Sequence, residues 1–101
     1  MRNSKEPESI DFEKMTDKKV ISLVVDGLVS RNRCYDFFKT KRGVELFKKA
    51  RIIMGFLKDL ENGAEIISEE NEKERVLITL ENKNEKYKRT VFMDKIMYSV
   101  F

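Results

Sequence analysis

The sequence predicts an α+β fold in which about three helices precede a short antiparallel sheet. Before Gly63 the apolar side chains recur at helical spacing, whereas after it they alternate with polar ones in stretches rich in β-branched residues. The chain has 101 residues, 41% apolar and 39% charged, which suffices for one domain with a modest core. We expect a disordered lead-in over residues 1–10 and a single domain over residues 11–101.

The first helix is predicted from Thr16 to about Val29. Thr16 is a favourable N-cap residue, and Asp17 follows it in the first turn, where the helix dipole favours negative charge. Apolar residues then fall at helical spacing, namely Val20, Leu23, Val24 and Leu28. Gly27 weakens the helix near its end by about 1 kcal/mol relative to alanine. The polar "SRNR" that follows is the predicted turn.

A short helix is expected from Cys34 to Phe38, and a long helix from about Arg42 to Glu61. The long helix carries a broad apolar stripe, which consists of Val44, Phe47, Ile52, Phe56, Leu57 and Leu60. Gly63, in "ENG", is expected to end it in a left-handed conformation. We expect Phe37 and Phe38 to be core residues. The alternative is that one of them packs on a side chain of a partner.

The remaining chain reads as strands. "AEIIS" and "ERVLITLE" surround the polar loop "EENEKE" and predict a hairpin. "NKNEKYK" is a second polar connection, and "RTVFMDKIMYSVF" supplies a last strand with a break near Asp94. Three helices with a trailing hairpin also fit a winged-helix domain.

Charge is segregated along the chain. Between Arg31 and Arg51, eight Lys and Arg residues face only Asp36 and Glu45. Between Glu61 and Glu85, eight Glu residues face three Lys and Arg residues. One interpretation is a pair of solvated faces that complement each other and keep a small protein soluble. The other is a basic surface that docks an anionic partner.

The candidate partner-binding residues are the cations of the basic segment, namely Lys39, Lys41, Arg42, Lys48, Lys49 and Arg51. Lys41, Lys48 and Arg51 can share one side of the long helix, so that their charges add locally. In a winged-helix domain the same helix would suggest nucleic-acid binding. The predicted wing loop, "SEENEKE", would however place carboxylates against the phosphates. A third alternative is a free-standing interaction domain of unspecified partner.

No catalytic or cofactor site is expected. The chain has no histidine, so the commonest general base and the imidazole metal ligands are missing. Cys34, the single cysteine, is expected to be a small buried residue. We therefore expect no enzymatic activity, no cofactor and no metal. The longest apolar runs, such as "IIMGFL", are far shorter than the roughly 20 residues of a membrane span.

The segment "RCYDFFKTKRGVELF" resembles a motif of the N-terminal cytosolic domain of the Sec translocation proteins of the sixty-two type. The matching positions are Asp36, Phe37, Phe38, Lys39, Lys41, Arg42 and Val44. "VFMDKIMYSVF" is similar to a second family segment, a Val-Phe-x-Asp followed by a Tyr. Its matching positions are Val91, Phe92, Asp94 and Tyr98. The Trp that follows this Tyr in the family is absent here.

The resemblance implies the cytosolic domain of a subunit of the endoplasmic-reticulum membrane, with membrane-spanning segments beyond Phe101. Its function would be post-translational protein import alongside the Sec channel complex. Members of the family use this basic domain to hold the acidic C-terminal tail of the J-domain Sec subunit. The six cations above would be the contacts. The resemblance implies no small-molecule substrate. Nucleic acid would be a partner only in the winged-helix alternative.

Overall fold

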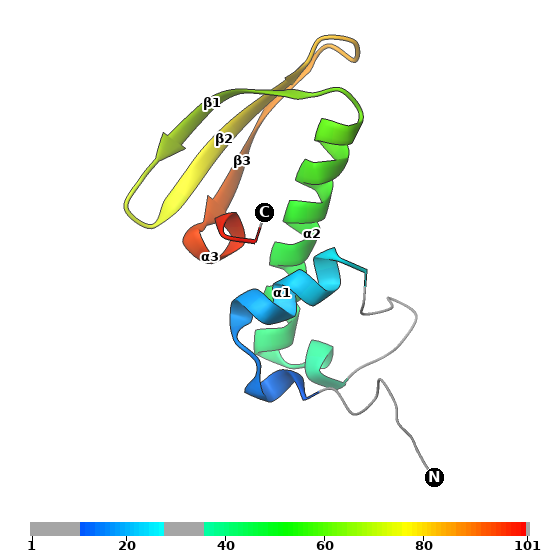
Figure 1. Cartoon of the computed structure of the whole chain (residues 1–101), viewed down its shortest axis with the longest axis vertical. Coiled ribbons are helices and arrows are strands. Elements are labelled where there is room, and N and C mark those ends of the chain that lie inside the picture. The colour runs from blue at the N-terminus through cyan, green and yellow to red at the C-terminus, as the bar shows by residue number, and fades with distance from the viewer. Residues whose placement is uncertain (1–10, 28–35, 101) are drawn as a thin grey trace.

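The computed structural model describes residues 11–27 and 36–100, in which helices precede a sheet (Figure 1). The elements are the 3-10 helix η2 (Phe12–Lys14), α1 (Asp17–Val25), the 3-10 helix η3 (Asp36–Lys39), α2 (Lys41–Glu61), β1 (Glu65–Asn71), β2 (Arg75–Asn82), β3 (Tyr87–Asp94) and α3 (Lys95–Tyr98). The predicted α+β class is confirmed. The lead-in expected over residues 1–10 and the turn expected at "SRNR" lie outside the described residues, as does Cys34.

Helix α1 begins as predicted but ends earlier. The hydroxyl of Thr16 accepts a hydrogen bond from the backbone N–H of Lys19 at 3.2 Å, which confirms Thr16 as the N-cap. The helix ends at Val25 instead of Val29, because Gly27 adopts the left-handed φ of 76° just beyond it. The predicted continuation through Leu28 and Val29 lies outside the described residues.

Helix α2 has the predicted bounds to within one residue. Thr40 is its N-cap: the hydroxyl accepts from the N–H of Gly43 at 3.1 Å and donates to the carbonyl of Phe37 at 2.6 Å. This double contact joins η3 rigidly to the first turn of α2. At the other end Gly63 has a φ of 103°, so the predicted left-handed end is confirmed.

The buried face of α2 differs from the predicted stripe. The side chains that are buried are those of Leu46, Ala50, Ile53 and Phe56, with Gly43 in line with them. Phe56 belongs to both sets, but Val44, Ile52 and Leu57 are 39%, 44% and 38% exposed, so the prediction is wrong for these three. Apolar type alone does not separate the two sets, because the packing of α1 and of the sheet against α2 decides which apolar side chains are buried.

The sheet has the order β1-β2-β3, with both pairs antiparallel. The predicted first hairpin is confirmed, although its loop shortens to residues 72–74 and β1 bulges between Ile66 and Ser68. The last strand ends at Asp94, whose carboxylate accepts from the N–H of Met97 at 2.7 Å and starts α3. The predicted break near Asp94 is confirmed, but the segment after it is a helical turn and not a strand, because this cap nucleates a helix.

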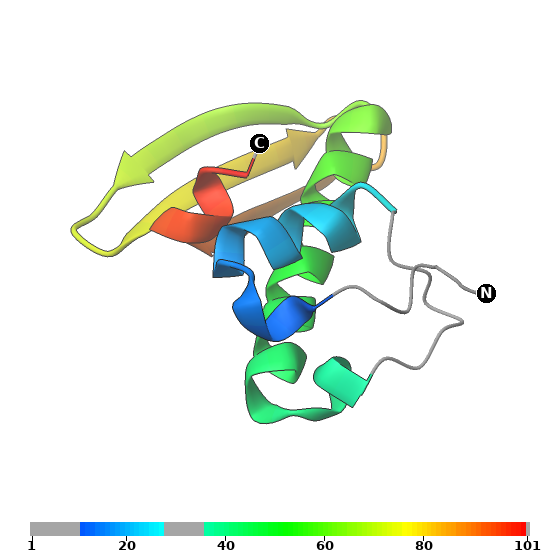
Figure 2. The same cartoon turned by 60° about the horizontal axis from the view of Figure 1, so that its bottom comes forward.

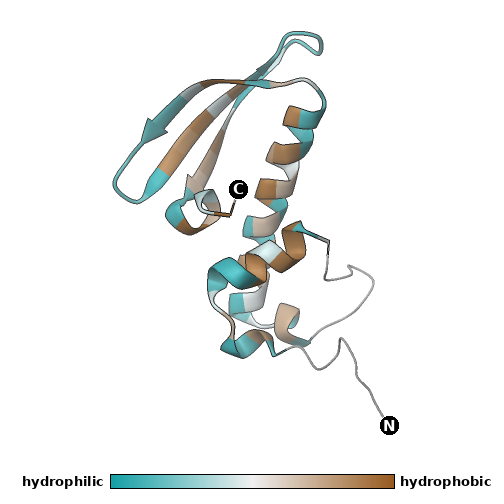
Figure 3. Cartoon of the chain, viewed as in Figure 1, coloured by the Kyte–Doolittle hydropathy of each residue, from teal (hydrophilic) through white to brown (hydrophobic). Residues whose placement is uncertain are grey.

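The helices lie on one face of the sheet (Figures 1 and 2). Alternate residues of β2 and β3 point into the core between the two layers, namely Val76, Ile78, Leu80, Val91 and Met93. Figure 3 shows hydrophobic residues along α2 and in the middle of the strands, and hydrophilic residues at both hairpin tips. On the opposite face Phe92 is 52% exposed, and the guanidinium of Arg75 stacks 5.2 Å from its ring centre.

Candidate docking surface on helix α2

An aromatic cluster fixes the start of α2. The rings of Phe37 and Phe38 lie with their centroids 5.3 Å and 5.1 Å from that of Phe12, and Phe38 also packs on Phe47 at 5.5 Å. Phe37 is buried and Phe38 partly buried, so the expectation that both belong to the core is confirmed. The six candidate cations follow directly on this cluster, and the structure divides them into two groups.

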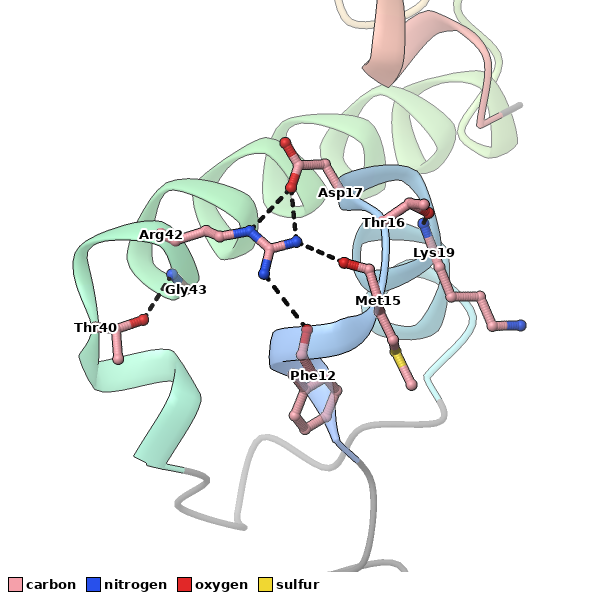
Figure 4. A network of polar contacts seen from close by, with 8 residues as sticks. All are labelled: Phe12, Met15, Thr16, Asp17, Lys19, Thr40, Arg42 and Gly43. Atoms are coloured by element: carbon pink, nitrogen blue, oxygen red, sulfur yellow. Dashed lines mark hydrogen bonds and ion pairs between the residues drawn. The ribbon is translucent and has the colours of Figure 1, made fainter.

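Arg42 belongs to the first group, which is engaged within the chain (Figure 4). Its guanidinium donates to the carboxylate of Asp17 at 2.8 Å and 3.0 Å, and to the carbonyl oxygen of Met15 at 2.7 Å. A longer bond of 3.5 Å reaches the carbonyl of Phe12, and the cation stacks 5.4 Å from the ring centre of Phe37. Arg42 thus clamps the segment before α1 to the first turn of α2.

Lys49 and Lys39 also have carboxylate partners. The ammonium of Lys49 lies 2.7 Å from the carboxylate of Asp94, and both side chains are about one-third exposed. Burial raises the pKa of Asp94, but the hydrogen bonds from Lys49 and from the Met97 N–H outweigh it and hold this pKa below its ordinary value. Lys39 makes only a long, exposed contact of 3.8 Å with Asp36.

Lys41, Lys48 and Arg51 form the second group. All three are exposed, and no carboxylate of the described residues lies within ion-pair distance of them. Their spacing of seven and three residues places them on one side of α2, as predicted. The other charge on the exposed side of this half of the helix is Glu45. Three cations therefore meet the solvent on one side.

Exposed apolar side chains lie beside these cations. Val44 and Ile52 are respectively three and eleven residues after Lys41 and so share its side of the helix. We call this surface the basic strip; it consists of Lys41, Val44, Lys48, Arg51 and Ile52. The residues that sequence reasoning missed are Val44 and Ile52, because their apolar character assigned them to the core. A buried face that already contained Leu46 and Ile53 was the signal that could have placed them outside.

The acidic segment does not neutralise the basic strip. In the described part of the chain, the carboxylates that pair with the cations of α2 belong to Asp17 and Asp94, neither of which lies between Glu61 and Glu85. Glu72 instead pairs with Arg75, and Glu69 accepts from the hydroxyl of Tyr98. Thus no ion pair among the described residues supports the interpretation of two faces that complement each other.

The basic strip is an open surface. A hollow of about 350 Å³ lies at the hairpin between β2 and β3, and no residue of the basic strip lines it. It is lined by Glu81, Asn82, Lys83, Lys86, Tyr87 and Lys88. Among the residues that the structure describes, no group of His, Cys, Asp and Glu is arranged to hold a metal ion, and no helix has the length and hydropathy to cross a membrane.

Comparisons of the chain with protein-family models, with curated proteins and with solved structures find no match. The resemblance to the Sec family and the winged-helix alternative therefore stay predictions. The site rests on the geometry of α2 alone.

Proposed function

We propose that the protein is a docking domain that captures an acidic chain segment on the basic strip of α2. The observation that carries this proposal is the exposure of Lys41, Lys48 and Arg51 on one side of the helix, without carboxylate partners in the described chain. Clustered cations attract a flexible acidic segment through summed Coulomb energy, which falls as salt screens it. Val44 and Ile52 add apolar contact area beside the charges.

The dimensions of the basic strip suit a short extended segment. Arg51 follows Lys41 by ten residues, which is about 15 Å along the helix axis. An extended chain advances about 3.3 Å per residue, so about five residues of a partner would cover the three cations. A segment with several acidic residues and one or two apolar ones would match both kinds of side chain, and such a segment needs no deep pocket.

The resemblance to the Sec translocation proteins supplies a particular partner for this proposal. It is the acidic C-terminal tail of the J-domain Sec subunit, and the setting is the cytosolic face of the endoplasmic-reticulum membrane during post-translational import. In this proposal Lys39 and the three cations of the strip contact the tail. Arg42 and Lys49 hold the surface in shape, since a tail would have to displace Asp17 or Asp94 to reach them.

The test is a fluorescence-anisotropy titration with a labelled peptide that carries the acidic tail sequence. The strip variant Lys41→Glu/Lys48→Glu/Arg51→Glu is compared with a control, Lys83→Glu/Lys86→Glu/Lys88→Glu, which makes the same charge change at the β2–β3 hairpin. We expect the strip variant to bind about tenfold more weakly or worse, because three charge pairs of up to about 1 kcal/mol each are lost. Equal losses in both variants would contradict the proposed site.

Two further arms separate the possible outcomes. A polyglutamate peptide of equal length and charge tests the specific partner: if it binds as tightly as the tail, docking of acidic segments stands and the translocation assignment falls. A labelled random DNA duplex tests the alternative. Tighter binding of the duplex, with a steep salt dependence that the strip variant removes, would replace the proposal with nucleic-acid binding.

A further inference from the structure

Strand β1 presents an acidic surface at the edge of the sheet. The strand order β1-β2-β3 leaves one side of β1 without a partner strand, and all seven of its residues are exposed. Glu69 and the neighbouring Glu72 are engaged by Tyr98 and Arg75. Glu65, Glu70 and Glu74 have no cationic partner among the described residues. We call these three carboxylates, together with Ile66 and Ile67, the acidic edge.

The acidic edge matches the basic strip in composition, with the sign of the charge reversed. Ile66 and Ile67 are 47% and 46% exposed, as Val44 and Ile52 are on α2. Each surface therefore has three unpaired charges of one sign and two exposed β-branched side chains. From Glu65 to Glu70 the strand covers about 17 Å. Glu74 lies beyond β1 in the following loop, and the register places Ile66 on the opposite face of the sheet from Glu65 and Glu70.

The strand also contains a charge conflict that a cation would relieve. The register places Glu65 directly opposite Glu81 on β2. Like charges in directly opposite positions destabilise a strand pair. The residue opposite Glu81 on its other side is Lys88, and no ion pair joins it to either glutamate in the described chain. Lys88 therefore offsets the charge of Glu81 in part, and a basic group from outside would supply the missing partner of Glu65 at this end of β1.

Within one molecule the two surfaces do not meet. Figures 1 and 2 both place β1 at the far edge of the sheet, away from the N-terminal half of α2 that carries the basic strip. No ion pair of the described residues joins the two. Each surface is thus available to another molecule.

We propose that the acidic edge of one copy docks on the basic strip of a second copy. The two surfaces are complementary in charge, and both carry exposed apolar side chains. Pairing of two acidic edges or of two basic strips is disfavoured, because like charges would face each other. The contact is therefore head-to-tail, and each added copy leaves one basic strip and one acidic edge free for the next.

This self-association uses the same basic strip as the proposed function but does not depend on it. An acidic partner segment and the acidic edge of a second copy would compete for Lys41, Lys48 and Arg51. A bound segment would therefore release the protein from the head-to-tail chain. Peptide binding needs the basic strip alone, whereas self-association needs both surfaces, so the two proposals can fail separately.

The test is sedimentation velocity of the full chain over a range of concentrations. It is done at an ionic strength of about 0.01 M, where the Debye length is about 30 Å, and at about 1 M, where it is about 3 Å. We expect association at low salt and at least about a tenfold weaker association at high salt. The edge variant Glu65→Lys/Glu70→Lys/Glu74→Lys and the strip variant should each be monomeric at low salt.

An equimolar mixture of the two variants decides the pairing. Each variant presents two surfaces of equal sign, but together they again supply opposite charges, so the mixture should associate when neither variant does. A control for association, Lys83→Glu/Lys86→Glu, which leaves Lys88 opposite Glu81 in place, should associate like the wild type. Circular dichroism shows whether each variant is folded. If one variant is unfolded, the other must still lose its association for the proposal to stand.

Three results would overturn the proposal. They are a wild-type protein that stays monomeric at low salt, an association that survives both sets of reversals, and a mixture that remains monomeric. In the first case a strip-dependent binding of the acidic peptide would leave the proposed function standing. Conversely, restored association in the mixture without any peptide binding would support self-association alone.

Discussion

Replacing Arg42 with Met should destabilise the protein by about 2–3 kcal/mol. The substitution keeps an unbranched stem of similar length and removes the guanidinium. The side chains of Arg42 and Asp17 are 36% and 41% exposed, so their ion pair contributes about 0.5–1 kcal/mol. The bond to the carbonyl of Met15 contributes about 1 kcal/mol, and the stacking on Phe37 about 0.5–1 kcal/mol.

Urea unfolding followed by circular dichroism measures this loss as a lower midpoint at constant slope. The control is the adjacent substitution Lys41→Met, which removes the same charge from an exposed position and should change stability by less than about 0.5 kcal/mol. In peptide binding the order should reverse, with Lys41→Met the weaker binder at concentrations where both variants are folded. If Arg42→Met proved as mild as Lys41→Met in urea, the division of the cations into clamping and exposed groups would be refuted.

Two further predictions concern the helix and its neighbours. Gly43→Ala should destabilise the protein by about 1–3 kcal/mol, because its Cβ would collide with the backbone carbonyl of Phe37. Gly55→Ala should stabilise it by about 0.5–1 kcal/mol, since its Cβ would meet only the end of the Arg89 side chain at 3.9 Å; equal effects of the two in thermal unfolding would contradict this packing. Because the pKa of Asp94 is lowered in the folded protein, its contribution to stability is present above the ordinary value of 3.8 and is lost as the pH falls through the folded pKa. The stability difference between wild type and Asp94→Asn should therefore shrink as the pH falls below about 4, and a difference that stays constant in urea titrations at each pH would argue against the contact with Lys49.

The elements with local signals could be predicted from the sequence. Thr16 and Gly63 mark helix ends through backbone preferences that act over a few residues, and both function as expected. The β-branched alternation identified β1 and β2 for the same reason. The helical turn after Asp94 escaped prediction, because the apolar residues that follow it fit a strand equally well and only the cap decides between the two.

The roles of the cations could not be predicted, because they depend on contacts between distant segments. Arg42 and Lys41 are neighbours in the sequence and have the same charge. Only the packing of α1 across α2 places Asp17 and the carbonyl of Met15 within reach of Arg42. Lys49 is likewise distinguished from Lys48 only because the end of β3 brings Asp94 beside it. Sequence reasoning could find the group of six but not separate its members.

The failure of the predicted apolar stripe is itself informative about the surface. Val44 and Ile52 obey neither the core pattern of α2 nor the rule that a solvent-exposed helix face is polar. Local rules that fail without a structural gain tend to mark functional positions. Here Val44 and Ile52 lie four residues before and after Lys48, and Val44 is also three residues after Lys41, so each is one helical turn from an exposed cation. A face that served only solubility would need the charges but not these side chains, so we infer that the basic strip is built for contact with another chain.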